Sequence, residues 1–151
     1  MQLALAIRQA KRIYLCGNGG SAANAIHIAN DLIACGVKAF ALPADVATLT
    51  AIANDFSYDE VFSRQLKTLA EKDDLLIVLS GSGRSKNILS ALTEARRIGM
   101  KSWAILGNYE PRGPAAGMAD QKILKGSNMQ LAEEYQLSTG HEVMRWLKRN
   151  S

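Results

Sequence analysis

Short apolar runs alternate along this chain with longer segments in which apolar residues recur every three or four positions. The short runs predict β-strands and the longer segments predict helices. From Leu75 to Leu79 no polar residue interrupts the run, which is typical of a strand buried on both faces of a parallel sheet. The predicted strands are residues 12–16, 37–42, 74–79, 101–106 and 121–125, and the predicted helices are 2–11, 21–34, 45–53, 58–70, 85–98 and 129–149.

The regular alternation of strand and helix predicts an α/β fold, a three-layer sandwich with a five-stranded parallel sheet between helices. Right-handed crossovers between five strands suit the flavodoxin-like strand order 2-1-3-4-5. No linker, repeat or low-complexity segment divides the 151 residues, so we expect one domain over residues 1–151. On the helix over 21–34 we expect Ser21 as the N-cap and an inward face made of Ala22, Ala25, Ile26, Ala29, Leu32 and Ile33.

Two loops rich in glycine and serine follow the first and third predicted strands. The first, residues 17–21, reads Gly-Asn-Gly-Gly-Ser, and the second, residues 80–85, reads Ser-Gly-Ser-Gly-Arg-Ser. Glycines let backbone N–H groups turn toward an anion, serines add hydroxyl donors, and the following helix adds a positive dipole end. In the strand order 2-1-3-4-5 these strands are neighbours at the switch point. We therefore expect one site for a small phosphorylated molecule, the alternative being that the serines serve only as helix caps and turns.

Composition narrows the class of protein. The chain is 48% apolar and 21% charged, with a net charge of +4 from scattered basic residues, so we expect solvated faces and no nucleic-acid partner. Of the two cysteines, Cys16 ends an apolar strand and is expected to be buried, which disfavours a disulfide. No apolar run reaches the length of a membrane helix and no signal-peptide pattern is present, so we expect a cytoplasmic protein without a membrane partner.

Other phosphate-binding motifs fit less well. Gly17, Gly19 and Ala22 satisfy a relaxed dinucleotide-binding pattern. That pattern also needs an acidic residue at the end of the second strand, whereas the first acid there, Asp45, comes too late. A Walker loop is absent from the sequence, which disfavours nucleotide hydrolysis.

Both loops, together with Asn54-Asp55-Phe56 and the run Val61-Phe62-Ser63-Arg64, resemble the SIS (sugar isomerase) domain family, and within it the phosphoheptose isomerase group. The resemblance runs from about residue 12 to the C-terminus. It implies a single phosphosugar-binding domain and a homotetramer with sites built across subunit contacts. The substrate-binding positions that it implies are Asn18, Gly19, Gly20, Ser21, Asn54, Asp55, Ser80, Gly81, Ser82, Ser85 and Glu133.

The two histidines of the chain are candidates for chemistry. His27 and Asp31 are four residues apart on one predicted helix and therefore share a face, while His141 lies on the last helix. Without the resemblance, a structural role for a lone helical histidine stays open. The resemblance implies a zinc site made of His27, Asp31, Glu133 and His141, with Asp31 in place of the group's glutamate and Glu133 in place of its glutamine. Both replacements keep an oxygen ligand.

Aldose–ketose isomerisation moves a proton between adjacent carbons through an enediolate, which requires an acid, a base and a stabiliser of negative charge. The resemblance implies that Asp31 and His141 are the acid–base pair and that sedoheptulose 7-phosphate becomes a heptose 7-phosphate for surface-polysaccharide synthesis. Cys35 and Gln130 depart from the group's pattern, which has a basic residue and an aspartate near these places. Two alternatives stay open: an isomerase of another sugar phosphate, and a non-catalytic module that binds a phosphosugar or associates with a replication initiator protein.

Overall fold

The computed structural model describes residues 1–150, in which five parallel strands form one sheet with the order β2-β1-β3-β4-β5. The predicted α/β class and strand order are therefore confirmed. The pairing register places Ile13 of β1 beside Ala39 of β2 and beside Leu75 of β3. The strands are β1 Ile13–Cys16, β2 Ala39–Ala41, β3 Leu75–Ser80, β4 Lys101–Leu106 and β5 Gln121–Leu124.

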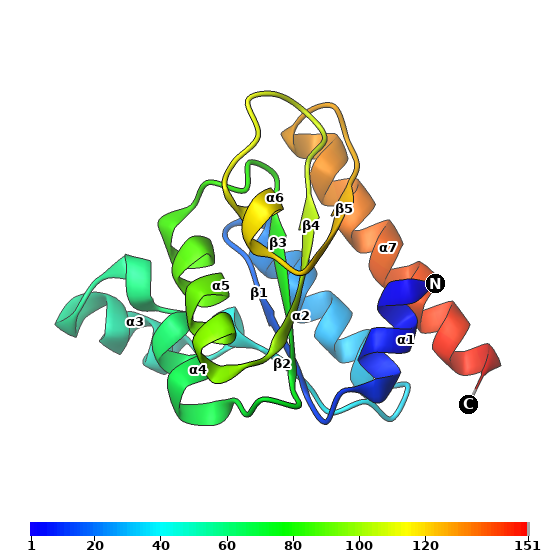
Figure 1. Ribbon diagram of the computed structural model, residues 1–151, viewed down its shortest axis with the longest axis horizontal. Helices are drawn as coiled ribbons and strands as arrows, with labels where there is room; N and C mark the ends of the chain where they lie inside the picture. Colours follow the sequence, from blue (N-terminus) through cyan, green and yellow to red (C-terminus); the bar gives the residue numbers. More distant parts are fainter. Residues whose placement is uncertain (151) are drawn as a thin grey trace.

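Helices cover both faces of the sheet (Figure 1). On one face lie α1, α2 and α7, and on the other lie α4, α5 and α6, with α3 projecting outward near β2 (Figure 1). The α-helices are α1 Gln2–Gln9, α2 Gly20–Ile33, α3 Val46–Asp55, α4 Ser63–Leu69, α5 Lys86–Ile98, α6 Ala115–Met118 and α7 Met129–Arg149, and the 3₁₀ helices are η1 Leu42–Ala44 and η2 Tyr58–Glu60. None of the helices in residues 1–150 is both long enough and apolar enough to cross a membrane.

Two hydrophobic clusters, one on each face of the sheet, form the core. Alternate residues of β3 supply them: Leu75 and Ile77 pack with α1, α2 and α7, whereas Leu76 and Val78 pack with α4 and α5. This follows from the two-residue period of a strand, which turns successive side chains to opposite faces. Every residue of β3 is buried, as the uninterrupted apolar run predicts. Cys16 is also fully buried, as predicted.

Tertiary packing changes several local expectations. The helix predicted over 58–70 is divided into η2 and α4, because Val61 and Phe62, both fully buried, anchor the chain between them. The expected inward positions Ile26 and Ile33 are exposed, since α2 presents a narrower face to the sheet. Ser21 is not the N-cap of α2: Gly19 occupies that position, and Ser21 is buried in the first turn.

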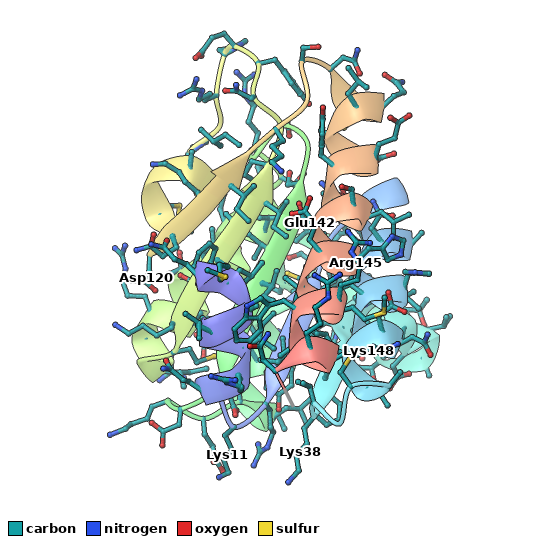
Figure 2. All side chains as sticks on the ribbon, turned by 90° about the vertical axis from the view of Figure 1, so that its right-hand side faces the viewer. Lys11, Lys38, Asp120, Glu142, Arg145 and Lys148 are labelled. Atoms are coloured by element: carbon teal, nitrogen blue, oxygen red, sulfur yellow. The ribbon has the colours of Figure 1, made fainter. Side chains whose placement is uncertain are left out.

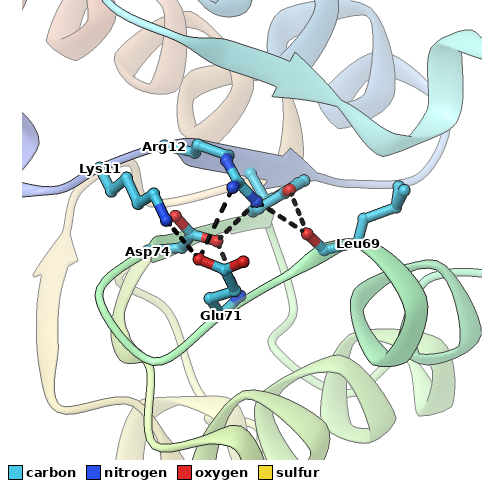
Figure 3. Close-up of polar contacts among 6 residues, drawn as sticks. Lys11, Arg12, Leu69, Glu71 and Asp74 are labelled. Atoms are coloured by element: carbon cyan, nitrogen blue, oxygen red, sulfur yellow. Dashed lines mark hydrogen bonds and ion pairs between the residues drawn. The ribbon is translucent and has the colours of Figure 1, made fainter.

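An ionic network joins β1 to the segment that precedes β3 (Figure 3). Lys11 Nζ lies 2.5 Å from Glu71 Oε2, and the guanidinium of Arg12 lies 3.6 Å from Glu71 and 3.7 Å from Asp74. Arg12 also donates to the carbonyl oxygen of Leu69. The network fixes the amino ends of two central strands, at the edge of the sheet opposite the two glycine- and serine-rich loops.

Charged side chains of α7 face outward beside α1, as Figure 2 shows for Glu142, Arg145 and Lys148. Lys148 and Arg149 lie in the last turn of α7, where positive charge offsets the negative end of the helix dipole. Lys11 and Lys38, which come just before β1 and β2, lie at the lower end of the molecule in this view (Figure 2). These four basic residues therefore lie at one helix end and at the starts of two strands.

Candidate functional site

The first loop turns at the carboxyl end of β1 and opens directly into α2. Gly19 adopts φ +56°, a left-handed conformation that favours glycine. A Cβ atom on Gly20 would overlap the carboxylate of Glu133, which comes from α7. Two helices far apart in the sequence therefore meet at the loop, and a side chain at position 20 would require the Glu133 carboxylate to move.

The second loop turns at the carboxyl end of β3 and is held by its own serines. Ser80 Oγ accepts a hydrogen bond from the backbone N–H of Gly83 at 2.9 Å, and Ser82 Oγ accepts one from Arg84 at 3.3 Å. Each hydroxyl keeps its own proton for donation to a ligand. Ser85 occupies the N-cap position of α5, so its hydroxyl lies at the positive end of that helix.

The two loops meet at one small cavity of about 100 Å³ at the carboxyl edge of the sheet. The expected convergence of the loops is therefore observed in the fold. Its lining residues are Asn18, Ser21, Leu79, Ser80, Gly81, Ser82, Ser85, Met129 and Glu133. We call this cavity the serine cavity. No basic side chain within residues 1–150 lines it. Its positive character therefore comes from hydroxyl groups and from the N-terminal ends of α2 and α5.

Arg84, the basic residue of the second loop, turns away from the serine cavity. Its guanidinium donates to the carbonyl oxygen of Pro111 at 2.5 Å, which ties the second loop to the segment between β4 and α6. Among the residues that the structure describes, Glu133 is the one charged residue that lines the serine cavity. A carboxylate there adds negative charge at a place whose other groups favour an anion.

Asn18 is held by partners on two other elements. Its Nδ2 donates to Asn87 Oδ1 at 2.9 Å, and its Oδ1 accepts from Asn87 Nδ2 at 2.8 Å and from the hydroxyl of Tyr58 at 3.0 Å. Sequence reasoning missed both partners. Asn87, two residues after Ser85, could have been found by extending the second loop into its helix, whereas no sequence signal brings Tyr58 to this place.

His27, Asp31 and His141 come together on the outer side of α2 and α7. Their ligand atoms all lie within 4.8 Å of one another. The two imidazole Nε2 atoms are 3.1 Å apart, and Asp31 Oδ2 lies 3.4 Å from His27 Nε2 and 3.6 Å from His141 Nε2. The side chains are 48%, 15% and 36% exposed for His27, Asp31 and His141. This histidine–aspartate cluster is therefore open to solvent on one side and anchored by a less exposed carboxylate.

Asp31 Oδ2 is buried and lacks a hydrogen-bond partner within residues 1–150. Two imidazole nitrogens and one carboxylate oxygen form a donor set that suits a divalent transition metal such as zinc. The three residues present in the cluster therefore fit the metal that the resemblance implies. Glu133 stands outside the cluster, at the serine cavity, and its assignment as a fourth ligand stays a prediction.

The cluster and the serine cavity lie along the same pair of helices. Gly20 begins α2, and His27 follows seven residues later, which corresponds to about 10 Å along a helix axis. On α7, Glu133 faces Gly20 and His141 faces His27, so the two helices pack in parallel beside both places. A ligand that uses both must therefore be elongated.

Asn54 and Asp55 lie at the exposed end of α3 and are not among the residues that line the serine cavity. Asn54 Nδ2 donates to Asp55 Oδ1 at 2.9 Å. Within one chain the structure therefore does not bring these two predicted substrate-binding residues to the other nine.

Cys16, just before the first loop, is fully buried, and burial raises the pKa of its thiol far above the ordinary range, so it stays protonated.

The fold defines the class: a doubly wound α/β domain in which two glycine- and serine-rich loops meet at the switch point of a parallel sheet. Residues 2–107 match the SIS domain, and the chain belongs to the SIS domain family.

Its relatives include the phosphoheptose isomerase of a Nitratiruptor species, 41% identical over 143 residues that make up 90% of this chain and 75% of that protein. The phosphoheptose isomerase of Helicobacter pylori (strain P12) is 46% identical over 102 residues, which are 64% of this chain and 53% of the relative. The solved phosphoheptose isomerase GmhA from Neisseria gonorrhoeae superposes with a TM-score of 0.90 at 32% identity, covering 98% of this chain and 84% of that one. Within the SIS family, the chain is thus similar to phosphoheptose isomerases.

Proposed function

We propose that the protein is an aldose–ketose isomerase that converts sedoheptulose 7-phosphate into a heptose 7-phosphate for surface-polysaccharide synthesis. The observation that carries the proposal is the placement of the serine cavity and the histidine–aspartate cluster along one helix pair, with His27 about 10 Å along the α2 axis from Gly20. That spacing suits an elongated sugar with an anionic group at one end and its reacting carbons at the other. The similarity to phosphoheptose isomerases supports the same conclusion.

In this proposal the serine cavity holds the phosphate. Ser21, Ser80, Ser82 and Ser85 donate hydroxyl protons, and the N-termini of α2 and α5 add backbone donors and a favourable dipole. The backbones of Gly19, Gly20 and Gly81 allow a close approach of the ligand. Glu133 faces the chain of the sugar from α7 and accepts hydrogen bonds from its hydroxyl groups.

Asp31 and His141 would carry the protons. One acts as the base that removes a proton from the hydroxymethyl carbon next to the ketone, and the other as the acid that protonates the carbonyl oxygen. Return of a proton to the neighbouring carbon, with loss of the proton from the terminal hydroxyl, completes the aldehyde. Asp31 Oδ2 and His141 Nε2 lie 3.6 Å apart, close enough to act on adjacent atoms of one sugar, and each carries a proton only while it is not coordinated to a metal.

His27, Asp31 and His141 would hold zinc, with Glu133 as the further predicted ligand. When bound, zinc supplies Lewis-acid stabilisation of negative charge on the sugar oxygens. The protein residues orient the sugar and move its protons. Asp31 Oδ2 is buried and has no hydrogen-bond partner among the described residues, only the two imidazole nitrogens 3.4 and 3.6 Å away, which supports a cation at this place.

A homotetramer in the cytoplasm is part of the proposal. The ten-residue helix α3 has no buried residue, and Ile26, Ile33 and Val46 are large apolar side chains that are exposed in one chain. Contact between copies would cover such side chains. Such a contact would also place Asn54 and Asp55, at the end of α3, beside the serine cavity of a neighbouring subunit.

The experiment that tests the proposal is an isomerisation assay on the purified protein with sedoheptulose 7-phosphate, with added zinc and after treatment with a chelator. We expect heptose 7-phosphate from the wild type and at least about a hundredfold slower formation from His141→Ala. Product formation that does not respond to zinc would remove the metal from the proposal. Absence of product from a wild type that still binds the sugar phosphate would overturn the proposed reaction.

A further inference from the structure

We propose that Asn87 is a positioning residue for the serine cavity. It sets the direction of the Asn18 amide, with the hydroxyl of Tyr58 as its second support. The inference rests on the proposed function only in that the serine cavity binds a phosphate. It does not depend on which sugar carries that phosphate.

The hydrogen-bonding capacity of the Asn18 side chain is almost fully used inside the protein. Its Oδ1 accepts from Asn87 Nδ2 and from the Tyr58 hydroxyl, which occupies both lone pairs. Its Nδ2 donates one proton to Asn87 Oδ1, so one N–H remains. Asn18 therefore offers a ligand a single donor and no acceptor, and this is the polarity that a phosphate or a sugar oxygen requires.

Asn87 is suited to impose that polarity. It lies in the first turn of α5 and is 2% exposed, so its amide has no water to exchange with. The reciprocal pair of bonds, 2.8 and 2.9 Å long, fixes both amide planes relative to each other. A buried amide keeps such partners because losing them leaves unsatisfied polar atoms.

The same pair of bonds connects the two loops. Asn18 belongs to the loop after β1, and Asn87 lies on the helix that follows the loop after β3. The donors of the two loops are therefore held in one arrangement before any ligand arrives, which reduces the ordering cost of binding. Tyr58 extends the connection to η2, which follows the α3 segment that carries Asn54 and Asp55.

The test compares Asn87→Ala and Tyr58→Phe with the wild type and with Thr93→Ala, a control on the exposed side of α5 whose hydroxyl bonds only within its own helix. Inorganic phosphate is the probe, titrated by NMR while the side-chain amide signal of Asn18 is followed. We expect Asn87→Ala to weaken phosphate binding about tenfold and to shift the Asn18 signal, because the remaining N–H of Asn18 is then mispositioned and its hydrogen bond to the phosphate is lost. Tyr58→Phe should weaken binding about two- to threefold, since the buried pair remains.

Tyr58→Phe decides the question if Asn87→Ala does not fold, because it removes one hydroxyl from a half-exposed ring. A purely structural role would lower the melting temperature but leave phosphate affinity and KM unchanged, and that result would overturn the inference. In the isomerase assay, a raised KM with a nearly unchanged kcat supports positioning of the bound phosphate. Weakened phosphate binding in the variants of a protein that does not isomerise sedoheptulose 7-phosphate would overturn the proposed function but support this inference.

Discussion

The Nε2 atoms of His27 and His141 lie 3.1 Å apart, although 114 positions separate the two residues in the chain. Their rings meet edge to face, with centroids 5.3 Å apart. At this distance one neutral imidazole donates and the other accepts, whereas two protonated rings would place two donors and two positive charges against each other. The pair therefore directs two ring nitrogens toward one place, with Asp31 Oδ2 beside them.

We expect His141→Ala to reduce turnover by at least about a hundredfold while leaving phosphate binding within about twofold of the wild type. The reason is that His141 belongs to the histidine–aspartate cluster, away from the serine cavity, and acid–base catalysis contributes about this much. Steady-state kinetics and a phosphate titration measure the two effects. Normal turnover in this variant would exclude His141 from the mechanism.

Ser82→Ala and Ser85→Ala should each weaken sugar-phosphate affinity about ten- to 150-fold with the fold intact. Each removes one hydroxyl donor to a charged group, which is worth about 1.5–3 kcal/mol. Ser90→Ala, on the same helix as the cap Ser85 but outside the serine cavity, is the matched control. Unchanged affinity in a calorimetric titration of both variants would show that these serines are caps and turns only.

Glu133→Gln should tighten phosphate binding severalfold at neutral pH. The substitution keeps the shape of the side chain and removes a negative charge from the lining of the serine cavity. Glu134→Gln, which removes a charge from an exposed neighbour on the same helix, is the control and should change affinity little. Weaker phosphate binding in Glu133→Gln would mean that the carboxylate does not oppose the anion. A parallel zinc titration tests its assignment as a metal ligand.

Gly140→Ala should destabilise the protein by about 1–3 kcal/mol, although alanine favours helices over glycine by about 1 kcal/mol. A Cβ atom at position 140 would lie 2.5 Å from Cγ1 of Ile28, in the contact between α2 and α7. Urea unfolding measures the change. In an Ile28→Ala background, Gly140→Ala should cost less stability than it does in the wild type, because the smaller side chain at position 28 leaves room for the new methyl group. A Gly140→Ala protein more stable than the wild type would contradict this packing.

Acid titration of stability should reveal the Lys11–Glu71 pair. The hydrogen bond from Lys11, together with its positive charge and that of Arg12, lowers the pKa of Glu71. A carboxylate whose pKa is lowered in the folded state stabilises the protein at any pH above its ordinary pKa. This contribution is lost as the pH falls through the lowered pKa. Glu71→Gln should therefore be less stable than the wild type at pH 7, with a difference that begins to shrink near pH 4.5 and vanishes only below the lowered pKa of the folded state.

Because the pair is exposed, the effect should be small and should diminish with added salt. Melting temperatures between pH 7 and pH 3 provide the measurement, with the exposed Glu142→Gln as control. A difference that persists unchanged at pH 3 would show that Glu71 acts through packing and not through its charge.

Local pattern was sufficient for the strands, because a run such as Leu75–Leu79 has one favourable placement in a parallel sheet. It was also sufficient for the loops, since glycine and serine after a strand favour the same turn chemistry wherever the strand lies. It was insufficient for the division between η2 and α4, where the burial of Val61 and Phe62 overrides helical periodicity. It also misplaced Ile26 and Ile33, because the width of a helix face that is covered depends on its neighbours.

The sequence by itself determined the fold class, the strand order and the meeting of the two loops, since these follow from periodicity, crossover handedness and turn residues. Only the tertiary structure decided that Asn18 bonds Asn87 and Tyr58 and that Glu133 lies against Gly20. These contacts join segments that are 40 or more positions apart, and no local pattern encodes which side chains meet when helices pack on a sheet. The side-chain contacts of the site therefore depend on how the helices pack on the sheet, whereas the sheet and the two loops follow from local sequence patterns.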